Sequence, residues 1–315
     1  MMLLARVAAA LLLCSLLTAC RASPVPSGPR AERARATSPA ELLPDDLDFV
    51  VRIDVARIRQ NPALAGVVRD LAKTKQSELL SSIHAALGEA SAVWAGTRWM
   101  SDGFHGDGVV ALEGPPGSDS ADMARPTMQA PLRRIATPAP DIEAFERPAN
   151  RGEAALEIVM GGHGVVLATA AEADAVLRVL RSGPDEGRLE PPARGLVSFA
   201  GRLRGGAPFG VASTGIMRGL GDGLVGYAGS LEEAESSTAP DAGAATTAIE
   251  VEATLVYASA AEAASAGKHA KQAIERLGLA GGVLERLANS VKLNETGASV
   301  NVRATLPFAW LAELH

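Results

Sequence analysis

The stretch Ile249-Glu-Val-Glu-Ala-Thr-Leu-Val-Tyr257 decides how the second half of the chain folds. Its apolar side chains stand at every second position, and Glu250, Glu252 and Thr254 occupy positions between them. Because successive side chains of a strand point to opposite faces, this alternation predicts a strand with one buried and one wet face. Such strands are typical of antiparallel sheets, since buried parallel strands have continuous apolar runs.

Similar strands are expected elsewhere in the chain. Residues 49–55 alternate in the same way, residues 156–167 read as a hairpin around Gly161-Gly162-His163-Gly164, and residues 291–306 read as a last hairpin. Further strands are expected at 91–99 and 107–113. Residues 128–150 are ambiguous.

Helices are expected between these strands. Asn61 is a suitable N-cap before one helix, a second covers residues 79–87, and Pro307 is suited to begin a short terminal helix. Two segments carry a capping box, Thr169-Ala-Ala-Glu-Ala173 and Ser259-Ala-Ala-Glu-Ala263. Each follows a strand, so each is expected to open a helix that packs against the sheet.

These elements predict an α+β fold, with antiparallel sheets and amphipathic helices packed on one face. The two similar capping segments leave two explanations open: an ancient duplication that gives two similar halves, or chance in an alanine-rich chain. Glu190-Pro191-Pro192 is the predicted boundary. We therefore expect one α+β module over residues 42–190 and a second over residues 191–315.

The N-terminus has the pattern of an export signal. Arg6 precedes an apolar run from Val7 to Leu13, which is shorter than the roughly 20 residues that span a bilayer. Leu17-Thr18-Ala19-Cys20 resembles the lipobox of bacterial lipoproteins. In that family the cysteine sulfur receives a diacylglycerol, and its amino group is acylated after cleavage. The resemblance implies a signal peptide over residues 1–19 and lipidation of Cys20; the alternative is an ordinary secretory signal with a chance cysteine.

The residues after the lipobox indicate which membrane would hold the protein and how the folded part would be attached. Arg21 stands where an aspartate favours retention in the inner membrane of such lipoproteins, so the resemblance implies the outer membrane, facing the periplasm. Residues 20–41 are rich in proline and serine and poor in large apolar groups. This composition predicts a disordered tether between the lipid and the folded part.

The amino-acid composition disfavours some classes of binding partner. The net charge of −6 gives the chain no general affinity for nucleic acid. Three Trp, two Tyr and six Phe offer few stacking platforms. Cys20 would be the only cysteine after signal cleavage, so no disulfide within the mature chain is expected.

The motifs that resemble catalytic or cofactor sites are weak. Gly221-Asp-Gly-Leu-Val-Gly226 matches a dinucleotide-binding pattern, but no strand precedes it and no helix follows it, so a flexible connection is preferred. Asp102, His105 and Asp107 share one glycine-rich turn and are weak candidates for metal ligands, because hairpin turns need the same residues. No cofactor is expected. No serine or acid has a position fixed relative to a histidine, so no catalytic triad is predicted.

The sequence therefore favours a membrane-anchored envelope protein with a non-enzymatic binding or structural role. The lipid on Cys20 would attach it to the membrane, and its protein or apolar-ligand partner is unknown. Two alternatives remain: a carrier of lipid or another apolar ligand held between sheet and helices, and an envelope hydrolase with an unrecognised triad.

Overall fold

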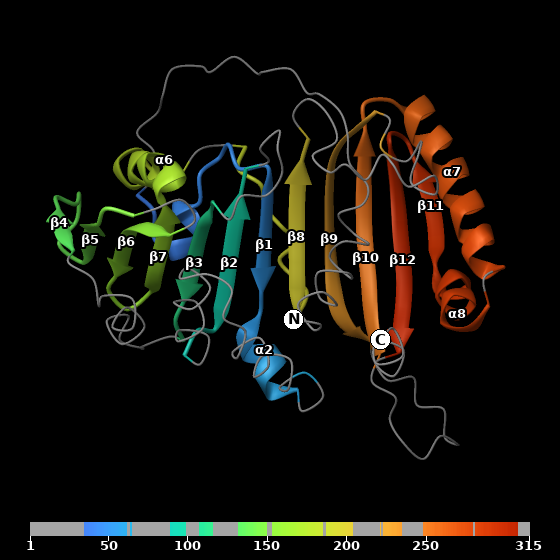
Figure 1. Ribbon diagram of the computed structural model, residues 1–315, viewed down its shortest axis with the longest axis horizontal. Coiled ribbons are helices and arrows are strands. Elements are labelled where there is room, and N and C mark those ends of the chain that lie inside the picture. The colour runs from blue at the N-terminus through green and yellow to red at the C-terminus, as the bar shows by residue number, and fades with distance from the viewer. Residues whose placement is uncertain are drawn as a thin grey trace. The chain divides into compact units, whose positions relative to one another are not determined.

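The computed structural model describes residues 35–61, 64, 89–98, 107–115, 132–149, 153–184, 187–203, 221, 223–234, 248–279 and 281–307. The chain divides into two compact units, which adjoin in the sequence at Glu190 and Pro191. Each unit contains an antiparallel sheet (Figure 1).

The sheet of the first unit has its strands in the order β1-β2-β3-β7-β6-β5-β4, and every neighbouring pair is antiparallel. The strands are β1 (Phe49–Ile53), β2 (Ala92–Thr97), β3 (Val109–Glu113), β4 (Arg133–Ile135), β5 (Ile142–Glu146), β6 (Ala154–Met160) and β7 (Gly164–Thr169). The hairpin expected at 156–167 is confirmed, with β6 and β7 as its arms.

Three described helical segments accompany this sheet: η1 (Pro39–Leu42), α2 (Val55–Gln60) and α6 (Ala170–Ser182). α6 lies against β6 and β7, and its Val176 and Leu180 belong to the buried core. η1 packs on β3, β7 and α6. Ala36 is 8% exposed within the same core, so the ordered part begins before residue 42, the start expected from the sequence.

The sheet of the second unit has the order β11-β12-β10-β9-β8, again antiparallel throughout. The strands are β8 (Val197–Arg202), β9 (Leu224–Ala234), β10 (Ala248–Tyr257), β11 (Lys292–Thr296) and β12 (Ser299–Pro307). The last predicted hairpin is confirmed as β11 and β12. Gly297 closes it with φ +57°, a conformation that favours glycine.

Two helices follow β10: α7 (Ala260–Gly278) and α8 (Gly282–Ser290). α7 packs on β10, β11 and β12, and it buries Ala263 and Ala266. On β10, Leu255 is 3% exposed whereas the side chain of Glu252 is 54% exposed. The alternation of residues 249–257 therefore corresponds to one buried and one exposed face of β10, as predicted. No helix in the described residues is long and apolar enough to cross a bilayer.

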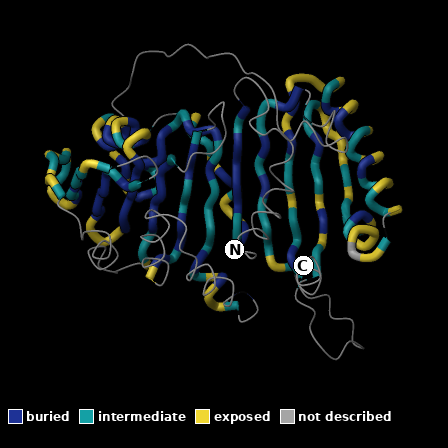
Figure 2. The backbone as a smooth tube through the Cα atoms, in the orientation of Figure 1, coloured by how far each residue is buried: buried dark blue, intermediate teal, exposed yellow. Residues whose placement is uncertain are grey.

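The predicted α+β class is wrong, because antiparallel sheet dominates the described chain and helices cover only part of it. In the first unit the sheet is also buried on both faces. Val166 and Leu156 lie in one core cluster, and Val165 and Leu167 lie in another. Every residue of β7 is buried, as Figure 2 shows in dark blue, so its continuous apolar run does not follow the one-face pattern.

The structure corrects or completes some of the remaining expectations, and others concern residues that it does not describe. The ambiguous segment 128–150 contains β4 and β5. Pro307 is the last residue of β12 and not the first of a helix. Residues 308–315 and most of the two helices expected between Asn61 and residue 87 lie outside the described residues.

The two faces of β10 predict opposite responses to truncation. Leu255→Ala should lower the free energy of unfolding by about 2–5 kcal/mol, because it removes buried methyl groups and leaves a cavity. Glu252→Ala should change it by less than about 0.5 kcal/mol, since the side chain is mostly in water. Urea unfolding of both variants checks this; equal effects would contradict the assignment of faces.

Candidate functional site

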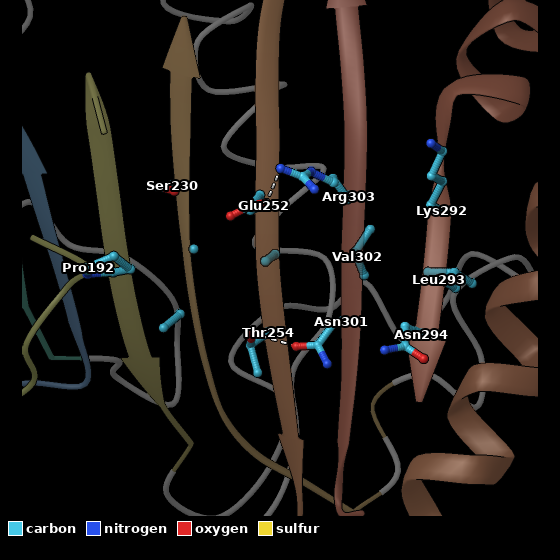
Figure 3. A pocket seen from close by; sticks show the side chains of 13 residues that line it. Pro192, Ser230, Glu252, Thr254, Lys292, Leu293, Asn294, Asn301, Val302 and Arg303 are labelled. Atoms are coloured by element: carbon cyan, nitrogen blue, oxygen red, sulfur yellow. Dashed lines mark hydrogen bonds and ion pairs between the residues drawn. The ribbon is translucent and has the colours of Figure 1, made fainter. Parts of the chain in front are cut away.

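A polar groove of about 480 Å³ lies on the sheet of the second unit, over β9, β10, β11 and β12. Seven polar side chains line it: Ser230, Glu252, Thr254, Lys292, Asn294, Asn301 and Arg303 (Figure 3). Five apolar residues also line it: Pro192, Ala228, Ala253, Leu293 and Val302. The groove is therefore formed by the wet face of the sheet.

The strand register arranges these side chains in two rows. Residues directly opposite each other in an antiparallel pair share a face. The first row joins Ser230, Glu252, Arg303 and Lys292 in that order across β9, β10, β12 and β11. The second row joins Ala228, Thr254, Asn301 and Asn294 across the same strands.

The charges of the first row are unevenly balanced. Arg303 donates from Nε to Glu250 and from Nη2 to Glu252 Oε1 at 2.9 Å. The hydrogen bond to Glu250 raises the pKa of the Arg303 guanidinium. Lys292 stands opposite Arg303 and has no acidic partner among the described residues. Among the described residues, Lys292 is therefore the charged member of the row that has no ion-pair partner.

The second row carries neutral hydrogen-bonding groups. Thr254 Oγ1 donates to Asn301 Oδ1 at 2.8 Å, and this leaves the amide nitrogen of Asn301 as a donor. The exposed side chain of Asn294 is paired opposite Asn301 on β11 and has no partner in the described part of the chain. The row therefore offers donors and an acceptor beside the ammonium group of Lys292.

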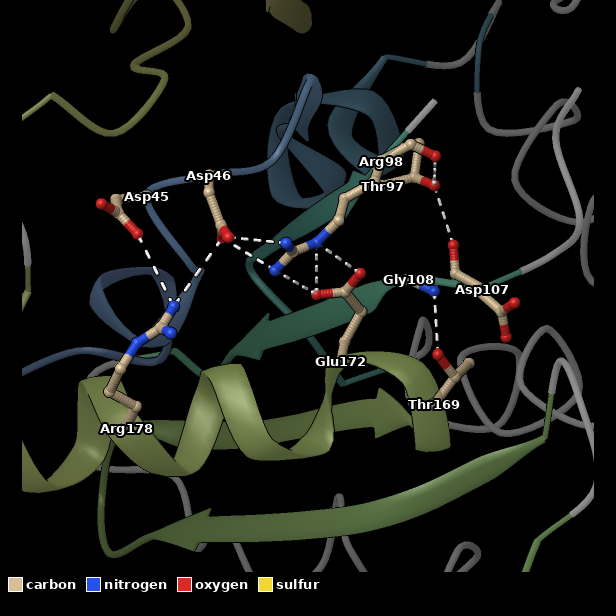
Figure 4. A network of polar contacts seen from close by, with 9 residues as sticks. All are labelled: Asp45, Asp46, Thr97, Arg98, Asp107, Gly108, Thr169, Glu172 and Arg178. Carbon is tan, nitrogen blue, oxygen red and sulfur yellow. Dashed lines mark hydrogen bonds and ion pairs between the residues drawn. The ribbon is translucent and has the colours of Figure 1, made fainter. Parts of the chain in front are cut away.

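A second polar cluster lies in the first unit and is centred on Arg98 (Figure 4). Its guanidinium donates to Asp46 from Nη1 and Nη2 at 2.6 and 2.7 Å. It also donates to Glu172 from Nε and Nη2 at 2.8 and 2.9 Å. Arg178 approaches Asp45 and Asp46 at 3.9 Å. One guanidinium thus fastens three segments that are distant in sequence.

Burial sets the electrostatics of this cluster. The side chain of Glu172 is 3% exposed, and this desolvation raises the pKa of its carboxyl although the hydrogen bonds from Arg98 act to lower it. The Arg98 guanidinium is also partly desolvated, which opposes its charge, but its carboxylate partners raise its pKa. Each of the three guanidinium nitrogens of Arg98 donates to a carboxylate, as expected of a structural ion pair.

The capping box predicted at Thr169 is wrong, because other partners take both of its side chains. Thr169 Oγ1 accepts a hydrogen bond from the Gly108 amide at 3.1 Å, and Glu172 pairs with Arg98. The N-cap predicted at Ser259 is confirmed, although the Glu262 side chain binds the Ser259 hydroxyl and not its backbone amide. Ser259 Oγ accepts from the Glu262 amide at 3.2 Å and donates to Glu262 Oε2 at 2.9 Å.

The residues singled out in the sequence are only partly described. Cys20, Asp102 and His105 lie outside the described residues. The backbone oxygen of Asp107 accepts from Thr97 Oγ1 at 2.8 Å. The described residues contain no group of three or more His, Cys, Asp or Glu that could hold a metal ion.

The two described histidines, His163 and His269, and the end of the glycine motif have structural surroundings without a catalytic partner among the described residues. His163 is exposed in the β6–β7 turn. His269 Nδ1 lies 2.8 Å from the Ser265 carbonyl oxygen, one turn earlier on α7. Leu224 to Gly226, the end of the glycine motif, begin β9 and so lead into a strand rather than a helix.

A second hollow, of about 440 Å³, lies between α7 and α8. Ile274, Leu279 and Ala288 contribute to its lining, and Leu279 is 88% exposed. An apolar-ligand carrier was expected to hold its ligand between sheet and helices, whereas this hollow lies between two helices.

Comparison with known proteins gives no family. No protein-family model matches the chain, and no curated protein matches it. Crystal form I of TP0453 is 11% identical, with a TM-score of 0.49 over 89% of this chain and 97% of that one. Crystal form III is 12% identical, with a TM-score of 0.47 over 88% and 97%. At this level of similarity the two structures carry no inference about function.

The Arg98 cluster predicts a large loss of stability on truncation. Arg98→Met should lower the free energy of unfolding by about 3–5 kcal/mol, because it leaves the Glu172 carboxylate buried without a partner. The matched control is Arg133→Met. Arg133 also pairs with a glutamate but is 79% exposed, so its loss should cost less than about 1 kcal/mol. Urea unfolding gives both values, and a similar cost for the two variants would refute the buried role.

The raised pKa of Glu172 predicts a dependence on pH. The folded protein holds this proton more tightly than the unfolded chain does. The contribution of Glu172 to stability is therefore greatest below the ordinary value of 4.5 and is lost as pH rises through its folded-state pKa. Glu172→Gln does not titrate, so its stability relative to the wild type should increase as the pH rises above the ordinary value of 4.5. Urea unfolding across this range tests the sign; a relative gain by the wild type would contradict it.

Proposed function

We propose that this protein is a lipid-anchored component of a bacterial cell envelope with a non-enzymatic binding role. The observation that carries the proposal is Leu17-Thr18-Ala19-Cys20, which follows the apolar run Val7 to Leu13. A lipobox at the end of a signal peptide places the acylated cysteine at the start of the mature chain. Several acyl chains, at about 0.8 kcal/mol per buried methylene, make such an anchor effectively permanent.

Arg21 supports the outer membrane as the destination, with the folded part facing the periplasm. In the sequence, about 15 residues lie between Cys20 and Ala36, which belongs to the described core. At about 5–6 Å times the square root of its length, a flexible segment of this size extends about 20 Å. The folded units would therefore remain close to the membrane surface.

The polar groove supports a binding role. It combines an ammonium group that has no ion-pair partner among the described residues with neutral donors, on a sheet that packs against α7. Sites on strands keep their side chains in fixed positions, which favours recognition of a ligand.

Replacement of the anchoring cysteine tests the proposal. Cys20→Ser should abolish incorporation of a tagged fatty acid, because serine has no thiol to receive the diacylglycerol. Cys14→Ser is the matched control: it removes the other cysteine, which lies within the signal peptide, and should leave incorporation unchanged. Metabolic labelling followed by membrane fractionation measures both effects. Label that persists on the Cys20→Ser protein would refute the anchor.

A further inference from the structure

We propose that the groove on β9–β12 binds a small organic ligand with a single carboxylate, held by Lys292, and with neutral hydrogen-bonding groups beside it, held by Asn294 and Asn301. This inference deepens the proposed binding role and rests on it. The chemistry fits the C-terminal end of a short peptide and fits a sugar acid equally well.

The first step concerns the charge at Lys292. Like charges directly opposite each other on neighbouring strands repel, and Lys292 is paired with Arg303 in this way. Glu250 and Glu252 compensate Arg303 from β10, on the side away from Lys292. The described residues therefore give Lys292 no carboxylate partner, and we expect a ligand to supply one.

The second step concerns the number of negative charges. Glu250 and Glu252 border the same row and would repel a second anionic group placed farther along it. A phosphodiester chain or another polyanion is disfavoured for this reason. A ligand with one carboxylate avoids this repulsion if its uncharged part extends along the second row.

The third step concerns size and position. Side chains two apart on a strand are separated by about 7 Å, and side chains opposite each other on neighbouring strands by about 5 Å. Lys292 and Asn294 are two apart on β11, and Asn301 stands opposite Asn294. These three groups match a carboxylate that carries one or two amides or hydroxyls. The groove volume of about 480 Å³ is also of the size that small-molecule sites have.

Calorimetric titration of the full-length protein in detergent tests the inference. The probes are acetyl-glycyl-glycine and glucuronic acid, and their uncharged counterparts are acetyl-glycyl-glycine amide and glucose. At least one acid should bind, about tenfold or more tightly than its uncharged counterpart, since a charge-assisted hydrogen bond is lost. Binding of the dipeptide alone would identify peptide ends as the ligand, and binding of glucuronic acid alone would identify sugar acids. If neither acid binds, or if acid and neutral probe bind equally, the inference is wrong.

Two variants with the same change of charge complete the test. Lys292→Met should weaken binding of the acid by about tenfold. Lys268→Met removes an exposed lysine from α7 and should leave binding unchanged. A third variant, Asn294→Ala, should weaken binding of the acid severalfold without changing the net charge. Unchanged binding to Lys292→Met, or equal weakening by both lysine variants, would overturn the site. Fatty-acid labelling of Cys20 is independent of this result, so a failure of the groove can be told from a failure of the anchor.

Discussion

The pairing of one guanidinium with two carboxylates is the constraint on which the arrangement of the first unit depends. Arg98 follows β2, Asp46 lies before β1, and Glu172 is in the first turn of α6. Desolvating a carboxylate as fully as Glu172 costs several kcal/mol unless a cation with matching donors accompanies it. The cluster therefore ties the first turn of α6 to the end of β2 and to the segment before β1.

The same constraint positions the chain before β1. This segment carries Leu43 and Leu47 into the core, where both lie above Gly96 of β2. A Cβ atom at Gly96 would come within 2.5 Å of Leu47 Cδ1, so a larger residue there would force that leucine to shift. The ion pair of Arg98 with Asp46 and the packing of Leu43 and Leu47 against Gly96 thus hold the same segment at two points.

The second unit combines a buried face with a face that can meet a ligand. Leu255 and Ala263 bring α7 onto the apolar face, and the opposite face of β10 then carries Glu252 and Thr254 into solvent. Because the sheet fixes the register, polar residues from four strands fall into rows without any loop to position them. The fold therefore provides the rigidity that a binding surface requires.

The strands could be predicted from the sequence where one face of the sheet is wet, as in residues 249–257. The strand β7 was also predicted, but the burial of both its faces was not, because its continuous apolar run has no alternation that would distinguish the faces. The groove was missed for another reason. Thr254, Asn301 and Asn294 are unremarkable in sequence, and only the register of three strands makes them neighbours.

Thr169 and Ser259 show the same limit. Their segments have nearly identical sequences, yet Ser259 caps its helix and Thr169 does not. A glutamate three residues after a cap can serve the helix or a tertiary partner. Glu172 meets Arg98, which is 74 residues away, whereas Glu262 remains with Ser259. Local sequence cannot distinguish these outcomes.

A double-mutant cycle over Arg98 and Glu172 tests the account most directly. It compares the free energies of unfolding of the wild type, Arg98→Met, Glu172→Gln and the variant with both changes. If Arg98 chiefly compensates a buried charge, removal of that charge should restore about 2 kcal/mol of the stability lost in Arg98→Met. If the effects of the two single changes add to within about 0.5 kcal/mol, the two side chains act independently. That result would contradict the claim that Arg98 compensates the buried charge of Glu172.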